Sequence, residues 1–337
     1  MSLRPFFALT LFGAYCAFVP AAAQTGAEPA AEPQKVRAWL MRIHEAASQR
    51  NFQGTFVVSG GGAVASARIA HYCEGRNQFE RIESLDGQAR HVFRHNDVVH
   101  TIWPGSRVAV IEQSQLLMSF PALLKAGDDR IVDYYDVRLQ GSDRVAGHEA
   151  NVLLVQPRDG HRFGYRLWSE KLSGLLLRAD VIGDRDEVLE TSAFSDVAID
   201  VKPRPESVLQ PMKKLDGYRV LRPVLTPTRL EAEGWTLRDV APGFREVSCV
   251  RRPIEDATGE RDAAAEPVLQ TIYSDGLTYV SIFIEPFNPQ RHARSMRASV
   301  GATQTLMRRQ GDWWITVVGD VPASTLKMFA KGLERKR

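Results

Sequence analysis

The histidines His91, His95 and His100 come nearest to a catalytic or metal-binding cluster in this sequence. They are unequally spaced along a stretch with the pattern of short strands, and no cysteine or carboxylate accompanies them at zinc-site spacing. Neither a Gly-x-Ser-x-Gly elbow nor a paired-carboxylate motif is present. The run Gly60–Gly62 lacks the helix and the Gly-Lys-Ser/Thr of a phosphate loop, which favours a hairpin tip. We therefore expect no enzymatic activity, no metal and no cofactor.

The arginines offer a different chemistry, which is the binding of anions. Segment 291–309 contains five arginines and no acidic residue, and a further pair stands earlier in the chain. Bidentate guanidinium pairing would suit an anionic lipid or an acidic peptide, and a solvated basic face is the alternative. The candidate contacts to such a ligand or to a protein partner are Arg251, Arg252, Arg291, Arg294 and Arg297, joined by Tyr279 and Phe283.

The last two of these residues belong to the stretch "YSDGLTYVSIFIEP", Tyr273 to Pro286, which predicts a strand after an Asp-Gly turn. Side chains alternate across a strand, and both faces of this one are apolar. Val280, Ile282 and Ile284 point one way, whereas Leu277, Tyr279 and Phe283 point the other. A C-terminal helix with Leu326, Phe329, Ala330 and Leu333 on one face is expected to cover the first side. The second side must meet another domain or a partner.

The N-terminal half has the pattern of one large antiparallel sheet. Turn signals such as Asp86-Gly87 and Pro104-Gly105 recur between short alternating segments. Helical patterns begin at Lys35 and at Leu116, and they could cap the concave side of the sheet. Aromatic and leucine side chains would then line an apolar groove, although core packing explains any one of them equally well. The candidate groove residues are Phe56, Tyr72, Phe93, Trp103, Phe120, Leu123, Tyr135 and Trp168.

The composition describes a folded two-domain protein. With 337 residues, of which 44% are hydrophobic and 25% charged, the chain is long enough for two cores. A formal charge of +3 argues against nucleic-acid binding as the main activity, and the apolar runs of the mature region are too short to span a bilayer.

The chain divides into five expected segments. Residues 1–23 have the basic start, apolar run and small-residue end of a cleavable secretory signal peptide, and 24–33 form a disordered leader. Residues 34–201 form the sheet domain, 202–227 a proline-rich linker, and 228–337 a second domain of strands and a closing helix. Export to the periplasm follows from the signal peptide.

Signal cleavage leaves two cysteines, Cys73 and Cys249, in the mature chain. We favour two separately buried thiols, which behave as small hydrophobic side chains. A disulfide that joins the two domains is the alternative in an oxidising compartment.

Four blocks of the sequence resemble a known family. They are "YYDVRLQGSDRVAGHEANVLLVQPRDGHRFGYRLWSEKLSGLLLRADVIG", "APGFREVSCVRRP", "TIYSDGLTYVSIFIEP" and "VVGDVPASTLKMFAKGL". In this order they are similar to blocks of the MucB/RseB family of periplasmic regulators of an envelope-stress sigma factor. The resemblance implies a mainly β (α+β) fold, with an unclosed antiparallel β-barrel and helical plug similar to lipoprotein carriers, then a small antiparallel sheet with a helix.

The same resemblance implies a function. Family members bind the periplasmic segment of a membrane-anchored anti-sigma factor of the RseA/MucA type and shield it from regulated proteolysis. Lipid or lipopolysaccharide signals release them, so these are the implied partners, with a homo-oligomer left open. The alternative is a periplasmic lipid or lipoprotein carrier, because the N-terminal architecture would serve it equally well.

Overall fold

The computed structural model describes residues 31–113, 131–253, 267–292 and 294–336. The expected signal peptide and the helical pieces from Leu116, with Phe120 and Leu123, lie outside these residues. None of the helices in the described ranges has the length and apolar character needed to span a membrane.

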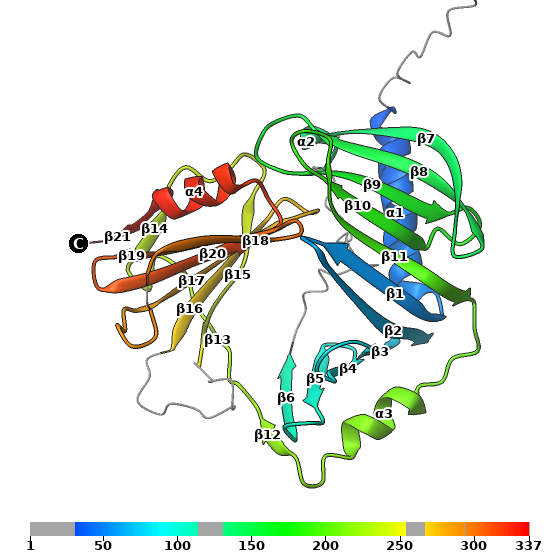
Figure 1. Ribbon diagram of the computed structural model, residues 1–337, viewed down its shortest axis with the longest axis horizontal. Coiled ribbons are helices and arrows are strands. Elements are labelled where there is room, and N and C mark those ends of the chain that lie inside the picture. The colour runs from blue at the N-terminus through cyan, green and yellow to red at the C-terminus, as the bar shows by residue number, and fades with distance from the viewer. Residues whose placement is uncertain (1–30, 114–130, 254–266, 293, 337) are drawn as a thin grey trace, which may run out of the picture.

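The N-terminal part is one open sheet of 12 strands with helices against it (Figure 1). Its strand order is β12-β6-β5-β4-β3-β2-β1-β11-β10-β9-β8-β7, and β12 pairs with β6 in parallel while the other pairs are antiparallel. No pairing among the described strands joins the two edges, β7 and β12, so the sheet is not closed into a barrel. The elements are α1 (Pro33–Gln49), β1 (Phe52–Gly60), β2 (Ala63–Glu74), β3 (Asn77–Ser84), β4 (His91–His95), β5 (Val98–Trp103), β6 (Val108–Gln113), α2 (Ile131–Tyr134), β7 (Tyr135–Val145), β8 (His148–Pro157), β9 (Gly164–Glu170), β10 (Leu176–Ile182), β11 (Val188–Ile199), α3 (Glu206–Lys213) and β12 (Arg219–Leu221).

Helix α1 packs against the sheet as its 3.6-residue periodicity predicts. Val36, Leu40 and Ile43 lie on one face of the helix and join a core that contains Phe52 of β1 and Leu167 of β9. Burial of each such side chain contributes about 1.5–3 kcal/mol. This core holds α1 to the half of the sheet formed by β7–β11 and β1.

The proline-rich segment 202–227 contains regular structure. It carries α3, whose Val208 is fully buried against Tyr72 and Phe93 of the sheet, and it carries the edge strand β12. Pro205 immediately precedes the helix, where a fixed φ is favourable. The segment predicted as a linker therefore includes a helix and an edge strand, because the apolar face of α3 covers the second core of the N-terminal sheet.

The C-terminal part is a seven-stranded sheet in the order β13-β15-β16-β17-β20-β19-β18, with a separate pair formed by β14 and β21. Helix α4 lies along one face of the larger sheet (Figure 1). Val280 and Ile282 of β17 pack there with Leu326 and Phe329, which confirms the expected cover of the first face. The elements are β13 (Thr226–Pro227), β14 (Trp235–Leu237), β15 (Arg245–Arg252), β16 (Val268–Ser274), β17 (Tyr279–Pro286), β18 (Met296–Val300), β19 (Thr303–Gln310), β20 (Trp313–Gly319), α4 (Ala323–Gly332) and β21 (Leu333–Arg335).

The two cysteines occupy separate sheets. Cys73 in β2 donates its thiol hydrogen to Ser48 O at 3.1 Å, and Cys249 in β15 is buried in the C-terminal core. Both are free thiols, so the alternative of a disulfide between them is wrong. Burial raises the pKa of the Cys249 thiol to about 11, which leaves it protonated at neutral pH.

Candidate functional site

The predicted groove residues do not form one continuous wall. Trp168 and Tyr135 are buried in the α1 core, and Phe56 packs on its margin against Phe194 with ring centroids 6.4 Å apart. Tyr72 and Phe93 belong instead to the core covered by α3. The half-exposed Trp103 is in neither core. An acyl-chain site at these residues stays a prediction.

Tyr135 has a role that the sequence did not indicate, because it joins the two domains. Its hydroxyl donates to Asp275 Oδ2 at 2.9 Å, and Arg162 Nε donates to the same oxygen at 2.7 Å. Asp275 Oδ1 accepts from the backbone N–H groups of Leu277 and Thr278 at 3.0 and 2.9 Å. The Asp275 carboxylate, which belongs to the β16–β17 turn, is thus buried with hydrogen bonds from both domains.

Arg162 completes this first domain contact. Its side chain is fully buried, and its remaining nitrogens donate to Asp159 and to the carbonyl of Pro242. The guanidinium lies 4.8 Å from the centroid of Tyr134 and 5.2 Å from that of Phe244. Burial, and then the nearby Asp275 carboxylate, raises the pKa of Tyr135 well above its usual value. We call Tyr135, Arg162 and Asp275 the buried contact.

A second contact joins the tips of two hairpins. Gly61, in the turn between β1 and β2, approaches Gly301, in the turn between β18 and β19, so closely that a Cβ on Gly61 would lie 2.6 Å from Gly301 N. The structure confirms the hairpin tip at Gly60–Gly62, and the glycines there permit this close approach. We call the meeting of these two turns the glycine contact.

Two carboxylates lie beside the glycine contact. Glu190 of β11 receives the backbone N–H of Ala302 at 3.5 Å, and Asp320 accepts from Thr303 Oγ1 at 2.6 Å. Burial, and then the Asp320 carboxylate, raises the pKa of Glu190; burial also raises the pKa of Asp320. Burial together with these two carboxylates raises the pKa of Tyr279 to about 12. The β17 face that carries Tyr279 therefore approaches the N-terminal domain.

Trp314, on the same face, is buried against Phe287 and His292, whereas the middle of that face lacks a described hydrophobic partner. Phe283 stands opposite Gln270 on one side and Thr316 on the other, and Thr316 stands opposite Met307. All are half-buried, and none joins a hydrophobic cluster of the described residues. We call the half-buried part of this surface of β16–β20 the open face; its apolar members are Ile272, Tyr279, Phe283, Met307 and Val318.

The candidate arginines differ in their partners. Arg291 pairs with Glu285, and Arg251 pairs with Glu233. Arg252 donates to Gln270 Oε1 at 3.1 Å and lies 4.0 Å from Glu112 in the N-terminal sheet. These ion pairs neutralise part of the positive charge that would otherwise attract an anionic ligand.

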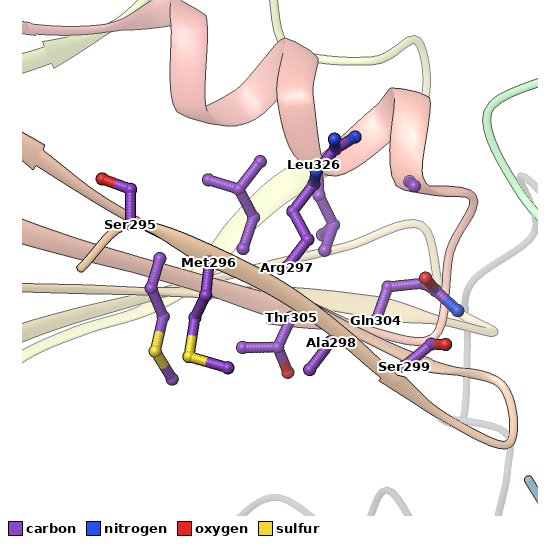
Figure 2. A pocket seen from close by; sticks show the side chains of 11 residues that line it. Ser295, Met296, Arg297, Ala298, Ser299, Gln304, Thr305 and Leu326 are labelled. Atoms are coloured by element: carbon purple, nitrogen blue, oxygen red, sulfur yellow. The ribbon is translucent and has the colours of Figure 1, made fainter. Parts of the chain in front are cut away.

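The other two candidate arginines are Arg294 and Arg297. Both are exposed, and no ion pair within the described ranges involves either one. Figure 2 shows Arg297 extending from β18 toward Leu326 of α4, above a hollow of about 680 Å³. Among the predicted arginines, these two are best placed to bind an incoming anion.

The comparisons with known proteins agree with this two-domain organisation. The model of the MucB/RseB N-terminal domain matches residues 35–212, and that of the MucB/RseB C-terminal domain matches residues 229–334. Sigma factor AlgU regulatory protein MucB of Pseudomonas aeruginosa is 30% identical over 312 residues, which cover 90% of this chain and 92% of that protein. Sigma-E factor regulatory protein RseB of Escherichia coli K12 is 27% identical over 299 residues, or 88% and 90% of the two chains.

A solved structure shows the same arrangement in a relative. Pseudomonas aeruginosa MucB in its complex with MucA has a TM-score of 0.68 and 27% identity, over 90% of this chain and 99% of that one. Both family models and the long matching relatives span the two domains described above. The chain therefore belongs to the MucB/RseB family.

Proposed function

We propose that this protein is a periplasmic negative regulator of an envelope-stress sigma factor. It binds the periplasmic segment of a membrane-anchored anti-sigma factor of the MucA/RseA type and shields it from regulated proteolysis. The observation that carries this proposal is the similarity across both domains to MucB, a protein whose solved structures include a complex with MucA. The activity is binding, without a chemical step by this chain.

The C-terminal sheet supplies features that a protein partner would use. The open face presents Phe283 and Met307 half-buried, and Arg297 of the β18 edge, which makes no ion pair among the residues described, extends from the opposite, α4 side of the same sheet. Aromatic, methionine and arginine side chains are all enriched at protein interfaces. A carrier that needed only an apolar groove would have no use for this second sheet.

Lipid or lipopolysaccharide would act as the releasing signal. The acyl chains would enter the N-terminal sheet, where each buried methylene contributes about 0.8 kcal/mol. By linkage, a lipid that weakens binding of the anti-sigma segment must itself be bound more weakly, by the same factor, when that segment is present.

Calorimetric titration tests both the binding of the anti-sigma segment and its weakening by lipid. The mature chain, residues 24–337, is titrated with the periplasmic segment of the anti-sigma factor from the same organism, before and after loading with lipopolysaccharide. Binding that the lipid weakens is the expected result. If the segment fails to bind while the lipid still does, the regulator proposal is wrong and the lipid or lipoprotein carrier takes its place.

A further inference from the structure

Strand β18 forms a free edge of the seven-stranded sheet. All of its residues are exposed, including Met296 at 48% and Val300 at 64%. An exposed edge with apolar side chains tends to pair with another strand, and proteins commonly blunt such edges with proline, a bulge or a covering element. The register of β18 with β19 is regular from Met296 to Val300, without a bulge.

The register also tells which backbone groups face outward. Gly301 and Ala302 form a two-residue turn, so the flanking Val300 and Thr303 make the first hydrogen-bonded pair of the ladder. Hydrogen bonding alternates along an antiparallel pair. The N–H and C=O groups of Ser299 and Arg297 therefore point to the open edge.

The side chains beside this edge favour an acidic occupant. Arg297 leans over the hollow next to α4, whose lining includes Leu306 and Leu326 (Figure 2). Arg294 adds a second exposed cation just before the strand. Antiparallel pairing with β18 of a second copy would bring these positive charges together, whereas a strand that carries carboxylates would pair with them.

We infer that β18 binds an extended, acidic segment of the anti-sigma partner as an additional strand of the sheet. The inference rests on the proposed function. It specifies that the partner binds in an extended conformation and at the β18 edge of the C-terminal sheet. Backbone hydrogen bonds to Ser299 and Arg297 supply part of the affinity, and a carboxylate against Arg297, with an apolar side chain in the hollow, supplies selectivity.

The first test uses Ser299→Pro with Ser299→Ala as its matched control. Proline removes the outward N–H, while the extended strand conformation tolerates it and the pairing with β19 keeps its own hydrogen bonds. The expected result is that Ser299→Pro weakens binding of the anti-sigma segment at least about tenfold, because an edge hydrogen bond and the approach of the added strand are lost. Ser299→Ala should bind as wild type.

The second test uses Arg297→Glu with Arg76→Glu, at an exposed turn of the N-terminal sheet, as a control of equal charge change. Arg297→Glu should weaken binding of the anti-sigma segment about tenfold or more, with little change for Arg76→Glu. Circular dichroism and thermal unfolding confirm that each variant is folded.

The outcomes separate the two proposals. If wild type binds the segment and both Ser299→Pro and Arg297→Glu bind equally well, the edge inference is overturned and the regulator proposal stands. If folded wild type does not bind the segment, both are overturned. Sedimentation showing a wild-type dimer that Ser299→Pro dissociates, with segment binding unchanged, would assign the edge to a second copy instead.

Discussion

The buried contact and the glycine contact join the same two domains by opposite means. At the buried contact, Asp275 has no exposed area and accepts hydrogen bonds on both carboxylate oxygens, and Arg162 neutralises it. At the glycine contact, two backbone turns meet beside Glu190 and Asp320, two carboxylates whose pKa values burial raises. The first contact is electrostatically satisfied, and the second keeps two like charges close together.

This difference indicates where the relative position of the two domains could change. A satisfied buried network is costly to break and fixes one geometry. At the glycine contact the hydrogen bond from Ala302 N–H to Glu190 is long, 3.5 Å, and no ion pair of the described residues involves Glu190 or Asp320. This contact lies at the tip of the hairpin that contains β18, and it should be easier to break than the buried contact. The two domains are therefore expected to stay joined at Asp275 and to adjust their relative position at Gly301.

Breaking the buried contact should produce the largest effect. Arg162→Met leaves the Asp275 carboxylate buried without its cation, and we expect a loss of about 3–5 kcal/mol in the free energy of unfolding. The double variant with Asp275→Asn should lose less than the sum of the single variants, because the uncompensated charge is gone. Urea unfolding followed by circular dichroism measures these values.

The exposed pair of Arg158 with Asp136, 2.9 Å apart, is the control. Arg158→Met should cost less than about 1 kcal/mol, as exposed pairs do. An equal loss for Arg158→Met and Arg162→Met would contradict the difference between a buried and an exposed arginine on which the comparison depends.

Crowding the glycine contact should have an intermediate effect. Gly61 and Gly62 both have positive φ, +60° and +80°, but a Cβ on Gly62 would have no atom within 4 Å. Gly62→Ala therefore measures backbone strain alone, about 1 kcal/mol, whereas Gly61→Ala adds the collision with Gly301 and should cost about 2–3 kcal/mol. Thermal unfolding of the pair gives the difference, and identical midpoints would mean that the turns do not meet in solution.

Removing one carboxylate should have the smallest effect, and it should depend on pH. Because folding raises the pKa of Glu190, the folded state holds a proton that the unfolded state has lost between the ordinary and the raised pKa. Its stability therefore falls as the pH rises through the raised pKa. Glu190→Gln should be more stable than wild type at neutral pH, which raises its thermal midpoint.

The check is a series of thermal melts from neutral pH down to the ordinary pKa range of glutamate. Wild type should gain stability relative to Glu190→Gln as the pH falls, until the two curves approach each other. A gap that stays constant with pH would show that Glu190 does not titrate differently in the folded state.

The strands and the outer helices could be predicted from local signals. Turn residues such as Asp86-Gly87 delimit β3 from β4, and the α4 face with Leu326 and Phe329 packs as its periodicity predicts. The sequence also indicated that both faces of β17 carry apolar side chains, and α4 covers the face that was expected to meet it. These predictions succeed because hydrophobic periodicity and turn chemistry are local properties.

The structural features that the sequence did not reveal depend on contacts between distant parts of the chain. Arg162 and Asp275 are separated by 113 positions, and an Asp-Gly turn signal does not reveal that its carboxylate enters another domain. Likewise, β14 pairs with β21 at the C-terminus, and α3 forms in a proline-rich segment because Val208 can be buried on the sheet. Only tertiary packing decides such features.

The central claim is that the C-terminal sheet, at its open face and its β18 edge, receives the anti-sigma segment. Hydrogen exchange of the mature chain with and without the bound periplasmic segment tests it most directly. The account predicts slower exchange on binding for the outward amides of Arg297 and Ser299, with smaller changes near Gly61. Slowing confined to β7–β11, with β18 unchanged, would contradict it.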